Sequence, residues 1–272
     1  MFSLPTHPPK TYAAVNCCIY CGADGALSDE HIVPLGLGGR WVLPESSCAK
    51  CAAKTSAFEL TCQRTMLGPL RMYYNMPSRR RHKRPATLPL KVKLTLNAEW
   101  SLLDVDREVC PFLVLLPLLP MPDELAGRTT TGERGAKARH LWIRGASFRD
   151  GIIPHLEALA AELNVAEIEP TGTLRVPEFL QMLAKIGHAF AVAEMGTGSF
   201  SPFLIPMICE ADTSNSVQYI GGLQRSEPAT NDVHELSFSS HACGRSDIVA
   251  VRIRLFAALE APTYYVAVGR RN

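Results

Sequence analysis

The chain has no hydrophobic run long enough to cross a membrane. Its most apolar stretch, residues 112–121, contains Pro117 and Pro120 and falls far short of the roughly 20 residues that a membrane-spanning helix needs. The first five residues show no charged segment followed by an apolar one, so no secretory signal is expected. The chain also lacks internal repeats and low-complexity stretches. We therefore expect no membrane partner and no repeat architecture.

Cysteine is too scarce for a disulfide-built protein. Nine cysteines in 272 residues cannot supply a disulfide framework, and their number is odd. We therefore expect a reducing, cytoplasmic setting, in which paired cysteines indicate metal sites more often than bridges.

Apolar content is ample, at 47% hydrophobic and 20% charged residues, so a packed core is expected. The length leaves room for one large domain, or for a small domain and a larger one.

Charge is unevenly distributed along the chain. Through residue 90 there are 11 Lys and Arg against 5 Asp and Glu, a balance of +6, whereas the rest of the chain holds 17 against 21, a balance of −4. The basic end is suited to a polyanion.

Two CxxC pairs in the basic end form the strongest motif. The pairs are Cys18 with Cys21 and Cys48 with Cys51, separated by a loop of 26 residues. Four thiolates in this pattern predict a tetrahedral Zn²⁺ site. The zinc is expected to be structural, because four thiolates leave no open position for a reacting water.

The loop between the pairs carries an acid–histidine segment, which reads Asp29-Glu30-His31-Ile32-Val33-Pro34. His31 can act as a general base near neutral pH. Glu30 or Asp29 can hold a hard cation such as Mg²⁺ or Mn²⁺. A base beside a divalent cation suits phosphodiester hydrolysis, although an isolated acid–histidine pair is more often an ordinary surface feature.

The order of these features resembles the zinc-stapled HNH endonucleases, whose core is a ββα-metal fold. The matching segments, within residues 16–62, are Cys18–Cys21, Glu30–Pro34, Gly38–Gly39 and Cys48–Cys51. The resemblance implies that His31 is the general base and Glu30 the ligand of a catalytic Mg²⁺ or Mn²⁺. It also implies DNA as the substrate.

The chain departs from this family at two points. The family usually has Asn shortly before the second cysteine pair, where residues 42–47 hold none, and Asn or His directly after the last cysteine, where Ala52 stands. Thr55, Ser56 and Glu59 lie on the expected helix and could substitute. Glu59 alone has a carboxylate, and we favour a solvated helix face for it.

These features predict an α+β protein. An irregular lead-in (1–15) precedes a zinc-bound ββα-metal module (16–65), and a basic connector (66–88) leads to a larger mixed α+β domain (89–272) with its own core. Within the module we expect strands at 32–34 and 40–43 and a helix at 49–63. In the larger domain we expect strands at 90–96, 140–143, 217–220, 233–238, 248–256 and 264–268, and helices at 155–163 and 178–195.

The connector contains a run of positive charge. The cations that we expect to contact phosphate are Arg79, Arg80, Arg81, Lys83 and Arg84. Tyr73 and Tyr74 precede the run. They could stack on bases, but we favour packing against the domain.

The C-terminal half offers no readable chemistry. His188 lies in an apolar helix and is expected to be a core histidine. Target recognition, gating of the nuclease and formation of a homo-oligomer are the roles left open to this half.

Three functions compete. The first is a metal-dependent HNH endonuclease that hydrolyses DNA, favoured by Glu30 and His31. The second is a non-catalytic, zinc-dependent nucleic-acid-binding protein, favoured by Ala52. The third is a structural zinc staple on a protein whose function lies in the C-terminal half.

Overall fold

The structure is a computed structural model that describes residues 4–6, 8–78, 82, 84–128, 140–145, 152–223, 225, 227–239 and 247–272. Helices and strands are mixed along the chain, so the predicted α+β class is confirmed. Within the described residues, no helix is long and apolar enough to cross a membrane.

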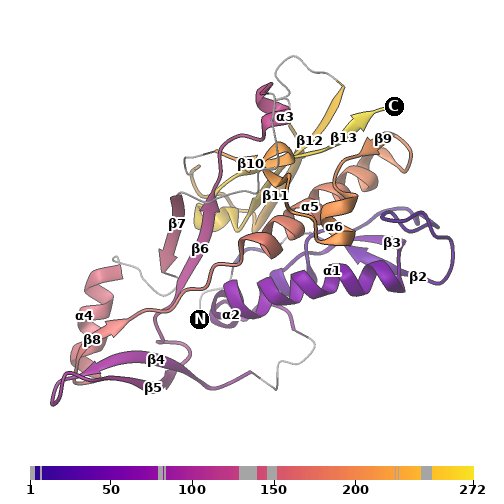
Figure 1. The fold of residues 1–272 in the computed structure, drawn as a ribbon. Helices are drawn as coiled ribbons and strands as arrows, with labels where there is room; N and C mark the ends of the chain where they lie inside the picture. The colour runs from indigo at the N-terminus through magenta and orange to yellow at the C-terminus, as the bar shows by residue number, and fades with distance from the viewer. Residues whose placement is uncertain are drawn as a thin grey trace.

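The described elements follow one another in the order shown in Figure 1. The strands are β1 (Lys10–Thr11), β2 (Leu27–His31), β3 (Trp41–Cys48), β4 (Thr87–Leu94), β5 (Trp100–Asp106), β6 (Leu113–Leu118), β7 (His140–Gly145), β8 (Val165–Glu169), β9 (Phe200–Pro202), β10 (Ile220–Gly222), β11 (His234–Phe238), β12 (Ile248–Leu255) and β13 (Tyr264–Arg271). The helices are α1 (Ala49–Thr61), α2 (Gly68–Tyr73), α3 (Asp123–Ala126), α4 (Ile152–Glu162), α5 (Val176–Met195), α6 (Ile205–Glu210) and α7 (Ser216–Tyr219). Two 3₁₀ turns, η1 (Leu35–Leu37) and η4 (Ala257–Leu259), and a π-helix, η2 (Cys62–Met66), complete the list.

The N-terminal unit has the predicted ββα order. Strands β2 and β3 pair antiparallel, β1 joins β3 in parallel, and α1 follows β3 without a break. The turn between the strands closes on Gly38, whose φ of 89° is left-handed and favours glycine. The first strand spans Leu27–His31, so the strand expected at 32–34 is wrong; those three residues follow the strand and are buried.

Helix α5 is the centre of the molecule. Every residue from Phe179 to Val192 is buried, as expected for a helix covered on all sides. One side packs on β12 and β13 and another on α1, so that α5 lies between the C-terminal sheet and the ββα unit (Figure 1). Gly187 allows the close approach to the sheet, because a Cβ there would lie 3.0 Å from Cγ1 of Val266.

The C-terminal sheet has the order β10-β13-β12-β11, and β9 pairs with the free part of β13. Strands β12 and β13 pair antiparallel, as predicted for the two segments. The expected strand at 217–220 is wrong over most of its length, because residues 216–219 form α7 and β10 begins only at Ile220.

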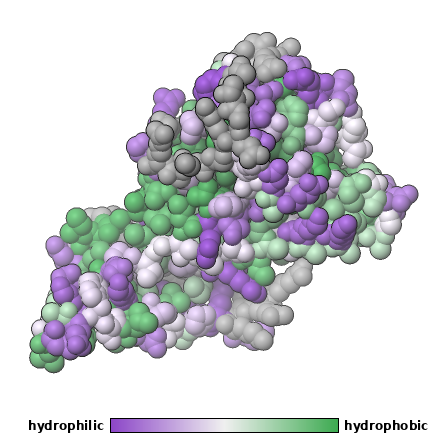
Figure 2. Space-filling view, viewed as in Figure 1, coloured by the Kyte–Doolittle hydropathy of each residue, from purple (hydrophilic) through white to green (hydrophobic). Residues whose placement is uncertain are grey.

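A smaller layer projects from one side of the molecule (Figure 1). Strands β5, β4 and β8 form its sheet, and α4 covers it around the buried side chains of Leu90, Val92 and Leu159. The β6–β7 pair joins this layer to the rest and leaves apolar side chains on the surface, where Leu141 and Ile143 are 37% and 51% exposed (Figure 2).

The ββα unit and the C-terminal half share one hydrophobic core. The same buried cluster contains Ile32, Leu37 and Phe58 from the ββα unit and α5, β12 and β13 side chains such as Phe179 and Val266. The position of the ββα unit is therefore determined by apolar packing against α5 as well as by its own hairpin.

Candidate functional site

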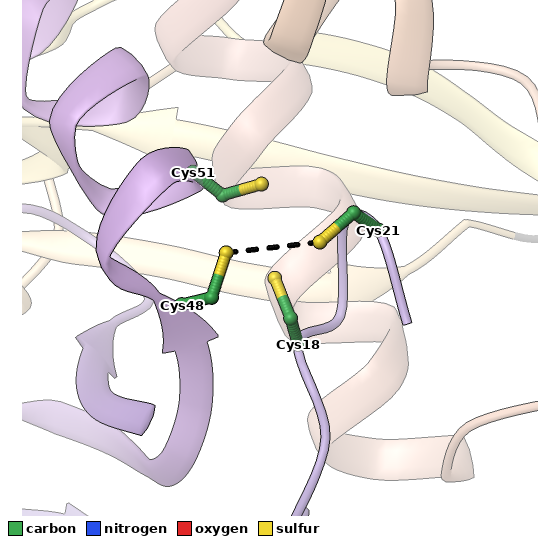
Figure 3. Close-up of side chains that lie close together, drawn as sticks. All are labelled: Cys18, Cys21, Cys48 and Cys51. Atoms are coloured by element: carbon green, nitrogen blue, oxygen red, sulfur yellow. Dashed lines mark hydrogen bonds between the residues drawn. The ribbon is translucent and has the colours of Figure 1, made fainter. Parts of the chain in front are cut away.

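Four cysteine side chains converge at one end of α1 (Figure 3). The Sγ atoms of Cys18, Cys21, Cys48 and Cys51 all lie within 4.8 Å of one another, and those of Cys21 and Cys48 are 3.7 Å apart. A tetrahedral zinc ion with Zn–S bonds of about 2.3 Å places its sulfurs about 3.8 Å apart. A disulfide would need about 2.05 Å. The four thiols therefore fit a metal such as zinc, and Cys17 is outside the group.

Local backbone structure explains this convergence. Cys18 and Cys21 flank a tight turn in which the Gly22 N–H donates to the Cys18 carbonyl at 2.8 Å. Cys48 ends β3 and precedes the first turn of α1, which contains Cys51. The Cys51 backbone N–H lowers the pKa of the Cys48 thiol to about 7, which favours the thiolate at that position, whereas burial raises the pKa of the Cys51 thiol.

The acid–histidine segment divides into a buried and a partly exposed half. Glu30 is buried, 7% exposed, and both of its carboxylate oxygens are engaged. Oε1 lies 2.7 Å from Nζ of Lys185 on α5, and Oε2 accepts a hydrogen bond from the Tyr20 hydroxyl at 3.1 Å. The divalent cation assigned to Glu30 stays a prediction, and the structure places a lysine ammonium against this carboxylate.

Lys185 has no exposed side-chain surface and contacts oxygen atoms from three elements or loops. Its Nζ lies 2.9 Å from Oε1 of Glu59 on α1, and it donates to the backbone carbonyls of His31 and, at 3.3 Å, Ile32. Burial alone lowers the pKa of a lysine, but the two carboxylates outweigh it and raise the pKa of Lys185. Lys185 is therefore a charged residue inside the protein.

Glu59 is not on a solvated helix face, which corrects the interpretation that we favoured from the sequence. Its side chain is 15% exposed and faces Lys185. Burial, together with the nearby charge of Glu30, raises the pKa of Glu59 above its ordinary value. The physical reason is that α5 covers this side of α1, which the local sequence does not reveal.

The sequence did not single out Lys185, although a signal was present. A lysine within an apolar helix is rarely buried unless it is paired. Its carboxylate partners lie more than 120 positions away in the chain, so spacing could not identify them.

His31 lies in the wall of an open cleft of about 800 Å³. The half-buried histidine ends β2, and the cleft extends from there across α1 to the π-helix and to the segment after α2. The α1 wall contains Ala52, Thr55, Ser56, Glu59 and Leu60. The cleft therefore combines an imidazole with hydroxyl and carboxylate groups, and Ala52 adds no ligand atom.

Two arginines line the same cleft. Arg71 is tied to the backbone, because Nε donates to the Gly36 carbonyl at 2.6 Å, Nη1 to Gln63 at 3.0 Å and Nη2 to Pro77 at 3.1 Å. Arg64 is exposed and forms no hydrogen bond or ion pair with another residue that the structure describes. Its guanidinium can therefore contact a ligand. It is carried by the π-helix, a feature frequent at functional sites.

Of the predicted phosphate contacts, Arg79, Arg80, Arg81 and Lys83 lie outside the described residues. Arg84 is described and donates to Oδ1 of Asn75 at 2.8 Å and to the Met76 carbonyl. Tyr73 and Tyr74 pack edge to face with each other, and Tyr73 also meets Phe112, so both tyrosines pack against the core as we favoured.

Two histidines of the C-terminal half attach to the ββα unit. His188 is buried, with Nε2 2.8 Å from the Ile19 carbonyl, and is a core residue as predicted. His234 accepts at Nδ1 from the Phe256 N–H, so its Nε2 donates to the Leu37 carbonyl at 2.7 Å. Lys185 and these two histidines thus bond the backbone on both sides of His31.

Comparison with protein-family models, curated proteins and solved structures found no match to this chain. The resemblance to HNH endonucleases therefore rests on the motif alone.

Proposed function

We propose that this chain is a zinc-stapled nucleic-acid-binding protein that receives the phosphate backbone in the cleft beside His31. The observation that carries the proposal is the meeting of His31, Arg64 and Arg71 in the wall of one cleft. Guanidinium groups match phosphate in both charge and geometry. The structural zinc would hold the turn at residues 18–21 to the start of α1, and so support the strands that carry His31.

The charge around the cleft is compatible with a polyanion. Asp29, Glu30 and Glu59 are among the lining residues, and alone they would repel phosphate. Lys185 pairs with Glu30 and Glu59 from behind, which leaves the exposed Arg64 to act outward, whereas Arg71 adds its positive charge to the cleft wall while it is bonded to the backbone. The basic run that follows in the sequence adds to the attraction.

Hydrolysis of DNA with Mg²⁺ or Mn²⁺ is the second candidate function. The position of His31 favours hydrolysis, because a general base for the reaction would lie in the cleft wall. We rank hydrolysis second because Glu30 and Glu59, the carboxylate on the α1 wall, both pair with Lys185, and because Ala52 and Ser56 present no carboxylate or imidazole. A Cys₄ zinc site with reduced thiols also fits a cytoplasmic protein.

Binding is tested with the zinc-loaded full chain and a fluorescein-labelled DNA duplex, by anisotropy over a range of salt concentrations. Arg64→Ala should weaken binding for every sequence and reduce the slope of log K against log salt by about 1. Arg271→Ala, which removes an exposed arginine at the far end of β13, is the matched control and should leave the slope unchanged. Equal slopes for the wild type and Arg64→Ala would remove the cleft from the proposal.

The basic run is tested separately. Replacing Arg79, Arg80 and Arg81 together by alanine should reduce the salt slope by up to about 3 if each contacts a phosphate. An unchanged slope would exclude the run as a contact surface.

Hydrolysis is tested by nicking of supercoiled plasmid with Mg²⁺ or Mn²⁺, comparing the wild type with His31→Ala. We expect DNA binding by both proteins and no more nicking by the wild type than by the variant. Nicking by the wild type that is lost in His31→Ala would make the chain an endonuclease.

A further inference from the structure

The ammonium of Lys185 lies in a group of four oxygen atoms that resembles a metal site in its chemistry. Two are carboxylate oxygens, from Glu30 at 2.7 Å and Glu59 at 2.9 Å, and two are the backbone carbonyls of His31 and Ile32. Carboxylate and carbonyl oxygens are the ligands that hard divalent cations prefer.

Lys185 does not supply enough hydrogen bonds or positive charge for all the oxygen atoms of this group. An ammonium has three N–H donors, fewer than the four oxygens around it. Oε1 of Glu59 is buried and forms no hydrogen bond, although it lies within ion-pair distance of Nζ. Two carboxylates also face a single positive charge. The group is thus richer in oxygen and in negative charge than one ammonium requires.

The group borders the cleft, although Oε1 of Glu59 and the side chain of Lys185 are themselves buried. Glu30 and Glu59 both line the cleft, whereas Lys185 approaches from α5 on the buried side. A cation entering the cleft would therefore meet the two carboxylates before it met the lysine.

We propose that the Lys185 ammonium occupies an oxygen site that would otherwise bind a divalent metal ion. In the native chain the ammonium pairs with both carboxylates and donates to the His31 carbonyl, so the site takes no divalent cation. Loss of the lysine side chain opens a site for one hard cation such as Mn²⁺. This inference concerns the cation site alone and does not depend on what the cleft binds.

The test is a titration of the zinc-loaded full chain with Mn²⁺, in which free Mn²⁺ is followed by its electron paramagnetic resonance signal. The Cys₄ group does not compete, because soft thiolates select zinc over manganese. The wild type should show no Mn²⁺ site that depends on Glu30. Lys185→Met should bind one Mn²⁺ with a dissociation constant of about 10⁻⁴–10⁻³ M, the range of weak oxygen sites.

A triple variant makes the result specific. The triple variant Glu30→Gln, Glu59→Gln, Lys185→Met removes all three charges, so it should fold and bind no Mn²⁺. If Lys185→Met is unstable, Mn²⁺ should raise its melting temperature and leave that of the triple variant unchanged.

Two results would overturn the inference. One is a Mn²⁺ site in the wild type that disappears in Glu30→Gln, because the metal would then displace the lysine. The other is a folded Lys185→Met protein that binds no Mn²⁺. Neither result bears on DNA binding, which the salt titration with Arg64→Ala decides separately.

Discussion

At the scale of single residues, the burial of charged and titratable groups determines how the site is built. Lys185 and Glu30 are nearly inaccessible to water, and removal of one partner from a buried pair typically costs about 3–5 kcal/mol because the other charge is left unpaired. Tyr20 and the carbonyls of His31 and Ile32 complete the environment of the pair. The backbone at His31 is therefore held by side chains that were not part of the motif.

We expect buried His188 to make stability depend on pH. It is 2% exposed and faces the rings of Tyr20 and Phe200, and burial lowers its pKa below the ordinary value of about 6.5. As pH falls below about 6.5, His188 therefore becomes protonated in the unfolded chain before it does in the folded chain. This difference should lower the free energy of unfolding by at most about 1.4 kcal/mol per pH unit between pH 6.5 and pH 5.

The measurement is urea unfolding at pH 7, 6 and 5. His188→Gln keeps an N–H donor for the Ile19 carbonyl and should lose this part of the pH dependence. His140→Gln, at an exposed position that starts β7, should retain the wild-type dependence. Identical pH profiles for the wild type and His188→Gln would exclude His188 as the source.

At the scale of elements, the cysteine group joins pieces that are too short to be stable alone. It links the turn at 18–21 to the junction of β3 and α1, where Cys48 and Cys51 lie. The ββα order follows from the local sequence, because the glycine-rich turn and the cysteine spacing act over a few residues.

The ends of strands were less predictable from the sequence. Residues 217–219 contain a β-branched valine and a tyrosine but form α7, since only Ile220–Gly222 reaches β13.

The zinc content of variants tests whether the four cysteines join these elements through a metal ion. Cys48→Ser should reduce bound zinc, measured by elemental analysis of the purified protein, from about one ion per chain to nearly none, and should lower the melting temperature. Cys17→Ser is the matched control, because Cys17 is adjacent to a ligand but outside the group, and it should keep its zinc. Unchanged zinc in Cys48→Ser would refute the Cys₄ assignment.

At the scale of the whole molecule, α5 unites the ββα unit with the C-terminal sheet. It supplies Lys185 and His188 to the N-terminal unit and covers Phe58 of α1 within the common core. His234 adds a further bond from β11 to the turn after β2. The parts of the molecule that carry the cleft are therefore stabilised from the opposite end of the chain.

A fragment that ends at residue 78 tests this dependence. Without α5 it exposes the apolar side chains of Ile32 and Phe58 and leaves Glu30 and Glu59 without their cation. We expect the zinc-loaded fragment to show no cooperative thermal transition by circular dichroism and poor dispersion of its amide resonances. A cooperative transition near that of the full chain would show that the ββα unit folds alone.

The amino-acid sequence by itself determined the four cysteines that could hold a metal ion, the ββα order and the α+β class, because each depends on spacing and pattern within a few dozen residues. Only the tertiary structure decided what surrounds Glu30 and Glu59, since their partner Lys185 lies far away in the sequence and reaches them through the packing of α5 on α1. The cleft that joins His31 to Arg64 and Arg71 is likewise a product of packing. Local patterns specify elements, whereas buried charge pairs and clefts form only when distant elements meet.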